Sequence, residues 1–161
     1  MKIKSISLVV LCLILVPSVS FSAGEEMTLK RMESIVKEMA TESEGKNGQV
    51  KFMFQNLEML LVSDPVRNRM RIIAPIARYA DLEKIHIDAA MASNFHLALD
   101  ARYAVRGGVL YSAYIHPLKE LTEEQVKSAV RQVSNLALTF GTQYTSGEMT
   151  FGLKKKEKPI H

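Results

Sequence analysis

The sequence has no tryptophan, a single cysteine and few aromatic residues. The one cysteine, Cys12, lies inside an apolar stretch near the N-terminus. If that stretch is removed from the working protein, no disulfide and no thiol nucleophile remain, and stability has to come from packing. Disulfide-stapled mini-domains and cysteine catalysis are thereby excluded, and the low aromatic content leaves no obvious stacking platform for sugars or bases.

The N-terminus has the three parts of a secretory signal peptide: two lysines, an apolar run of about a dozen residues and then small residues. Ser20 and Ser22 are the small side chains that the peptidase needs, so we expect cleavage after Ser22, with cleavage after Ala23 as the second choice. The apolar run is shorter than the roughly 20 residues of a membrane-spanning helix, and Pro17 interrupts its end. We therefore predict that residues 1–22 are removed, that the protein is periplasmic or secreted, and that no integral membrane span remains.

The remaining length suits one domain, which we place at residues 26–146. The full chain carries a formal net charge of +4. Two of these charges are lysines of the signal peptide, and others lie in the Lys154-Lys155-Lys156 run, which we place in a flexible basic tail at residues 147–161. So small a charge imbalance gives no reason to expect a nucleic-acid partner.

Hydrophobic periodicity predicts an α+β fold, an antiparallel five-stranded sheet with helices in the order α-β-β-β-α-β-β-α. A Gly- and Asn-containing turn ends the first helix, Asp81 is expected to cap the second, and Thr122 with Gln125 forms a capping box for the third. The expected elements are helices at 26–43, 81–93 and 122–144, and strands at 49–55, 57–63, 69–76, 95–105 and 109–116.

The last two strands are expected to form a hairpin across Arg106-Gly107-Gly108. A three-residue loop pairs Tyr103 with Tyr111 and makes every cross-strand pair apolar or aromatic. A two-residue loop on the glycines is the alternative, but it sets apolar residues against polar ones, so burial favours the three-residue register.

Three polar residues on this hairpin are the candidates for a metal or acid–base site. In the predicted register, His96, Asp100 and His116 share a face of the sheet. The alternative, which we favour, is that they are ordinary solvated residues, because no paired His-x₃-His or Cys-x₂-Cys spacing accompanies them. We therefore predict no catalytic residue, no metal and no cofactor.

Arginines cluster near the second hairpin, and Arg67, Arg69 and Arg71 form a candidate anion-binding patch. The alternative is a solvated face with salt bridges to Asp64 and Glu58, which is the more common role for such residues.

The second predicted helix has apolar residues on two sides, so it needs two surfaces to pack against. One of these is expected to be a partner subunit. The residues proposed for this partner or dimer surface are Leu82, Ile85, Ile87, Ala90, Met91 and Asn94.

The same region carries a family resemblance. The run from Ala89 to Phe95 leading into Leu97–Asp100, the Gly107–Tyr111 hairpin and the Thr122–Gln125 helix start resemble the type III secretion chaperone (Tir chaperone, CesT-like) and YbjN-like fold group. The resemblance implies a small, dimeric, non-enzymatic protein that holds a segment of another polypeptide and dimerises through a region matching Leu82–Val105.

Those chaperones are cytosolic and usually acidic, whereas this chain has an export signal and is slightly basic. We therefore expect an exported, chaperone-like binding module whose partner is another protein. The alternative is a periplasmic protein that binds a small ligand or a metal, with hydrolytic chemistry as one option.

Overall fold

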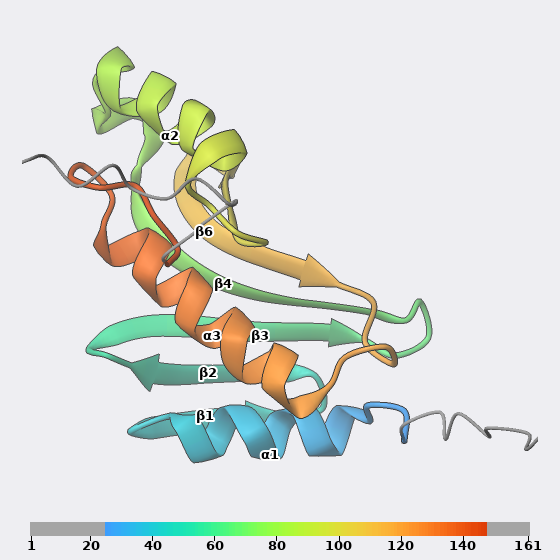
Figure 1. Cartoon of the computed structure of the whole chain (residues 1–161). Coiled ribbons are helices and arrows are strands. Elements are labelled where there is room, and N and C mark those ends of the chain that lie inside the picture. Colours follow the sequence, from blue (N-terminus) through green and yellow to red (C-terminus); the bar gives the residue numbers. More distant parts are fainter. Residues whose placement is uncertain (1–24, 148–161) are drawn as a thin grey trace, which may run out of the picture.

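The computed structural model describes residues 25–147 and shows a six-stranded antiparallel sheet with three helices (Figure 1). The predicted α+β class is confirmed, but the sheet has six strands and not five. The predicted signal peptide and residues 148–161 of the predicted tail lie outside the described residues. The elements are α1 (Leu29–Met39), β1 (Glu42–Lys46), β2 (Gln49–Phe54), β3 (Leu57–Asp64), β4 (Arg69–Arg78), α2 (Lys84–His96), β5 (Arg102–Arg106), β6 (Val109–His116) and α3 (Glu123–Leu138).

Strand β1 is the sixth strand, where a helix end and a turn were predicted. Helix α1 ends at Met39, and β1 then pairs with β2 through the turn Asn47-Gly48. Both turn residues have positive φ, 56° and 85°, as a two-residue hairpin requires. All five residues of β1 are exposed, so the strand has no apolar alternation that a sequence pattern could detect.

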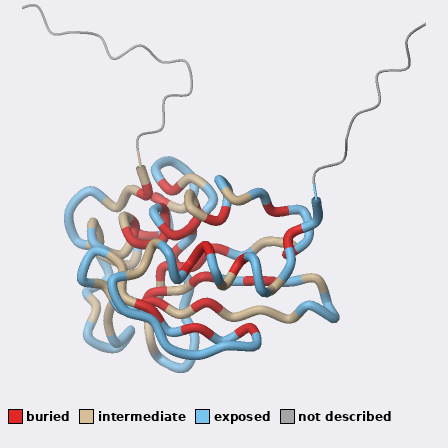
Figure 2. Tube along the Cα trace, turned by 90° about the horizontal axis from the view of Figure 1, so that it is seen from below, coloured by how far each residue is buried: buried red, intermediate tan, exposed pale blue. Residues whose placement is uncertain are grey.

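The strands are arranged in the order β1-β2-β3-β4-β6-β5, and α1 and α3 lie against one face of this sheet (Figure 1). The buried residues form one core between the helices and the sheet, and their segments of the chain lie in the interior of the molecule (Figure 2). Each large apolar side chain buried there stabilises the fold by about 1.5–3 kcal/mol relative to an exposed one. Fully buried residues with large side chains include Met32, Val36, Val50, Phe52, Met59, Leu61, Met70, Ile72, Val126, Val130, Val133 and Leu136.

Helix α3 begins as predicted. The Thr122 hydroxyl accepts a hydrogen bond from the Gln125 N–H at 3.2 Å, and the Gln125 side chain accepts one from the Thr122 N–H at 2.8 Å. The helix ends at Leu138, however, and not at Tyr144 as predicted. Residues 139–147 form turns instead, in which Gly141 and Tyr144 have positive φ.

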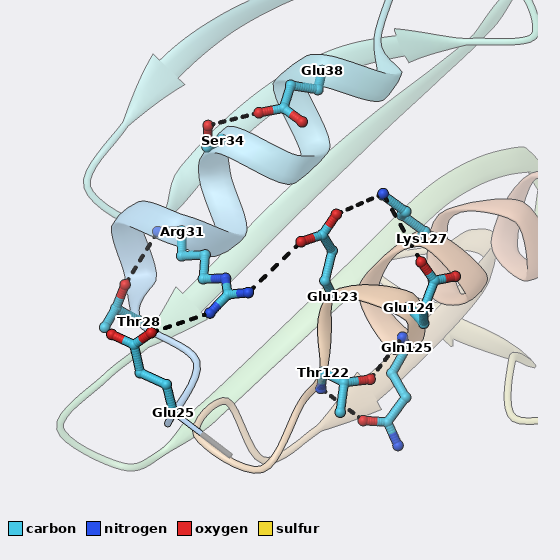
Figure 3. Close-up of polar contacts among 10 residues, drawn as sticks. All are labelled: Glu25, Thr28, Arg31, Ser34, Glu38, Thr122, Glu123, Glu124, Gln125 and Lys127. Atoms are coloured by element: carbon cyan, nitrogen blue, oxygen red, sulfur yellow. Dashed lines mark hydrogen bonds and ion pairs between the residues drawn. The ribbon is translucent and has the colours of Figure 1, made fainter.

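A chain of charged groups ties α1 to the start of α3 (Figure 3). Arg31 lies 3.5 Å from Glu25 and 3.7 Å from Glu123, and Glu123 also accepts a hydrogen bond of 2.6 Å from Lys127. The hydrogen bond from Lys127, with the nearby positive charges, lowers the pKa of the Glu123 carboxyl. Because these groups are exposed, the network orients the two helix ends more than it stabilises them.

The hairpin of β5 and β6 has a two-residue turn, so the predicted three-residue register is wrong. Arg106 lies opposite Val109, and Tyr103 lies opposite Ser112. Gly107 and Gly108 occupy the turn with backbone φ angles of 56° and 75°. Residues other than Gly, Asn and Asp rarely adopt such positive φ angles.

The apolar partners of Tyr103 come from the segment after α3 and not from β6. Its ring lies edge-on to Phe140 at 5.7 Å and to Tyr144 at 6.3 Å, and its hydroxyl donates to the Leu136 carbonyl at 2.8 Å. Tyr103 is therefore buried without facing Tyr111, which is why counting apolar cross-strand pairs selected the wrong register.

Helix α2 also departs from the prediction at both ends. Asp81 lies in a short 3₁₀ turn, where it accepts a hydrogen bond from Arg78 at 2.8 Å, and it does not cap the helix. The helix begins at Lys84 and continues to His96. Phe95 is therefore helical, and the strand predicted to start there begins only at Arg102.

Candidate interaction surfaces

One side of α2 is fastened to the rest of the fold at both ends of the helix. The Asn94 side chain accepts a hydrogen bond from the Tyr103 N–H at 2.8 Å and donates one to the Tyr103 carbonyl at 3.2 Å. The Ser93 hydroxyl donates to the Tyr144 carbonyl, and the His86 ring nitrogen Nδ1 lies 2.6 Å from the Tyr144 hydroxyl. Helix α2 is thus held between the edge of β5 and the segment after α3.

The opposite side of α2 is exposed and largely apolar. Ile85, Met91 and Phe95 are 68%, 63% and 83% exposed. Their spacing places them on one side of the helix, together with Asp88, which pairs with Lys84 at 2.5 Å. We call Ile85, Met91 and Phe95 the outer face of α2.

The six residues predicted for a partner surface are divided between the two sides of this helix. Ile85 and Met91 contribute to the outer face, whereas Asn94 binds the edge of β5. Ile87 and Ala90 lie on the other side, where they line an apolar depression of about 160 Å³ together with Leu82, which precedes the helix, and residues of the hairpin. Met91 borders both surfaces. Sequence reasoning missed Phe95, although its position four residues after Met91 is a signal for a shared helix face.

The three candidate arginines do not converge on one site. Arg67 pairs with Asp64 at 2.8 Å, and its hydrogen bonds lower the pKa of the Asp64 carboxyl. Arg69 donates to the Asn68 carbonyl at 2.9 Å, while Arg71 lines a depression on the sheet. Of the two expected acidic partners, only Asp64 pairs with an arginine, because Glu58 pairs with Lys51 at 2.6 Å.

The candidate metal residues lie on three different elements. His96 is the last residue of α2, Asp100 lies in the loop before β5, and His116 ends β6. The predicted shared strand face is therefore wrong, although Asp100 and His116 line one depression of about 310 Å³. Within residues 25–147, no group of three or more His, Cys, Asp or Glu side chains is placed to hold a metal ion.

His116 and Asp100, which line this depression, already make hydrogen bonds within the protein. His116 Nδ1 lies 2.7 Å from the Pro117 carbonyl, and the N–H of Asp100 donates to the Gln132 side chain at 2.8 Å. Gln132 also accepts from the N–H of Ala101 at 3.2 Å and is 6% exposed. These contacts fix the loop before β5 onto α3, which is a structural role.

Among residues 25–147, no helix packs on one face of the sheet. Helices α1 and α3 pack on the other face, and α2 lies at the opposite end of the sheet from α1, against the β5–β6 hairpin (Figure 1). Ile73 and Tyr111 are partly exposed on the uncovered face, and Ile115 is 60% exposed. The geometry therefore offers two partly apolar surfaces, this face and the outer face of α2, and both are suited to binding a macromolecule.

None of the helices within residues 25–147 has the length and apolar character needed to cross a bilayer.

Comparison with solved structures identifies the fold. A chain of the HopA1–SchA chaperone–effector complex matches with a TM-score of 0.51 and 11% identity, over 67% of this chain and 91% of its own length. The type III secretion chaperone SycH of Yersinia pestis, solved with a stable fragment of YscM2, matches with a TM-score of 0.50 and 13% identity, over 68% and 99%. This chain has the fold of type III secretion chaperones.

A further match is a chain of the ExsC–ExsE complex, with a TM-score of 0.53 and 15% identity, over 69% of this chain and 91% of that chain. Comparisons of the sequence with protein-family models and with curated proteins give no match. At these identities the similarity establishes the fold alone.

Proposed function

We propose that this chain is a chaperone-like protein-binding module without enzymatic activity, which holds a segment of another polypeptide. The observation that carries the proposal is that, within residues 25–147, helices cover one face of the sheet and leave Ile73, Tyr111 and Ile115 partly exposed on the other. The type III secretion chaperone fold supports it, because similar chains were solved in a chaperone–effector complex and with a partner fragment.

Site-specific photo-crosslinking tests the proposal. A photoreactive amino acid replaces Ile115 on the uncovered face, and in the control it replaces Val66, which is 94% exposed in the turn between β3 and β4. We expect a polypeptide to be cross-linked in cells through position 115 and not through position 66. Equal labelling at both positions, or no cross-linked polypeptide, contradicts a binding role for this face.

Export is the second part of the proposal, and it rests on the sequence of residues 1–22. The chain recovered from a periplasmic or extracellular fraction is expected to begin at Ala23, or at Gly24 if cleavage follows Ala23. Intact-mass measurement distinguishes these products. Recovery of the full chain from the cytoplasm alone contradicts export.

We also propose that the protein is a homodimer that buries the outer face of α2. Three exposed apolar side chains on one helix face support this, because such a patch is unfavourable in water. A Phe95→Glu variant is expected to sediment as a monomer, whereas the matched Val66→Glu control keeps the dimer of the parent protein. A parent protein that is monomeric at micromolar concentration contradicts the dimer.

A further inference from the structure

The uncovered face of the sheet contains a depression that combines apolar and basic side chains. It lies over β4, β5 and β6 and has a volume of about 480 Å³. Ile73, Tyr111 and Ile115 supply apolar and aromatic surface there, and Arg71 and Arg106 also line it. Tyrosine and arginine are the residue types that most often dominate binding energy at protein interfaces.

Among residues 25–147, the arginines of this depression have no acidic partners. No Asp or Glu lines it, and within residues 25–147 neither Arg71 nor Arg106 lies within 4.0 Å of a carboxylate. Arg67 and Arg78, by contrast, each pair with an aspartate at 2.8 Å. In the part of the chain that the structure describes, the depression therefore presents two positive charges that no carboxylate pairs, beside a small apolar surface.

The register of the sheet explains how the charges and the apolar residues come together. Arg71 lies opposite Ile115, and Ile73 lies opposite Ala113 on the neighbouring strand. Side chains two residues apart on a strand point to the same face of the sheet. Arg71 and Ile73 on β4, with Ala113 and Ile115 on β6, therefore share the uncovered face. A ligand that fits this depression needs apolar groups for its centre and carboxylates for its flanks.

We propose that the depression binds a polypeptide segment in which acidic residues flank apolar ones. This inference rests on the proposed protein-binding function and specifies the chemistry of its ligand. The chain's own C-terminal segment fits less well, because residues 148–161 contain four lysines and two glutamates. Charge complementarity therefore favours a separate, acidic polypeptide.

A pair of fluorescent synthetic peptides tests this ligand chemistry with the protein lacking residues 1–22, the form expected after export. In one peptide glutamates flank leucines, and in its analogue glutamine replaces each glutamate. We expect the acidic peptide to bind about five- to thirtyfold more tightly by fluorescence anisotropy, which is the effect of two exposed ion pairs, and the difference to shrink as salt rises.

Variants locate the binding. Changing Arg71 and Arg106 together to Gln is expected to make the two peptides bind alike, whereas the control Arg67→Gln, in a turn outside the depression, keeps the preference. In methyl NMR spectra the acidic peptide is expected to shift the signals of Ile73 and Ile115 but not that of Ile35, which is buried in α1.

The outcomes separate this inference from the proposed function. Equal affinity for both peptides, or an unchanged preference in the double variant, overturns the acidic ligand while polypeptide binding stands. If sedimentation shows that the double variant no longer self-associates, the occupant of the depression is a second copy of this chain and the proposed acidic ligand is wrong. If neither peptide binds although a partner is cross-linked through position 115, the inference is wrong and the proposed function stands.

Discussion

The contact between Asn94 and the edge of β5 gives the sharpest test of how α2 is held. The amide side chain of Asn94 makes two hydrogen bonds to the main chain of Tyr103, at 2.8 and 3.2 Å, in the way that a neighbouring strand would. Each bond is expected to contribute about 1 kcal/mol to the free energy of unfolding. Asn94→Ala should therefore lower that free energy by about 1–2 kcal/mol and the Tm by roughly 3–8 °C.

Alanine is also a better helix former than asparagine, which hides part of this loss. The exposed neighbour Ala92 supplies the correction, because Ala92→Asn measures the same propensity difference in α2 without the contact. Urea denaturation of the three proteins gives the free energies. Amide hydrogen exchange at Tyr103 should accelerate in Asn94→Ala and remain unchanged in Ala92→Asn.

The Asn94→Asp variant tests the donor half of the contact. Its carboxylate can still accept from the Tyr103 N–H, but its second oxygen faces the Tyr103 carbonyl and repels it unless it is protonated. Protonation is therefore favoured in the folded state, which raises the pKa of the new carboxyl above its unfolded value near 3.9. The deficit relative to the parent protein should shrink as pH falls from neutral towards about 4, the unfolded pKa, and change little below it. A deficit independent of pH, with no loss in Asn94→Ala, refutes this account of the contact.

Three further predictions concern the loop, the hairpin and a buried tyrosine. Gln132→Leu leaves two loop N–H groups without an acceptor and should cost about 2–3 kcal/mol in urea denaturation, whereas Gln132→Glu retains an acceptor and should cost less. At the β5–β6 turn, Gly108→Val should lower stability by about 1–2 kcal/mol and Gly108→Asn by less, as measured by thermal denaturation. Burial raises the pKa of the Tyr103 hydroxyl, so the free energy of unfolding should fall as pH rises above about 10. Tyrosinate absorbance should increase in the same transition, and Tyr103→Phe should weaken the pH dependence.

Regular patterns in the sequence predicted the centre of the sheet and the last helix. Strands β2, β3 and β4 alternate between buried and more exposed residues over part of their length, which is a period that a sequence reading detects. Helix α3 combines a capping box with apolar residues at helical spacing. Where local preference and burial agree in this way, the sequence is sufficient to assign the element.

The sequence was insufficient where an element depends on contacts with distant residues. Strand β1 has no buried residue, and its only sequence signal is the Asn47-Gly48 turn. The residues between α2 and β5 read as a strand, but their N–H groups bind Gln132 and Ser146, which follow far along the chain. The predicted partner surface omitted Phe95 for the same reason, because α2 continues to His96 and so places Phe95 on its outer face.

The hairpin register shows how one such distant contact determines the chemistry of the uncovered face. A shift of one residue exchanges the two faces of a strand. In the predicted register Tyr103 faced Tyr111, whereas in the structure Ala104 does, with Arg102 and Arg106 on the same side. Tyr103 points inward because Phe140 and Tyr144 provide its packing. The aromatic contacts that bury Tyr103 thus also place Arg106 on the same face as Tyr111, so the share of the positive charge that Arg106 brings to the depression follows from packing on the opposite side of the sheet.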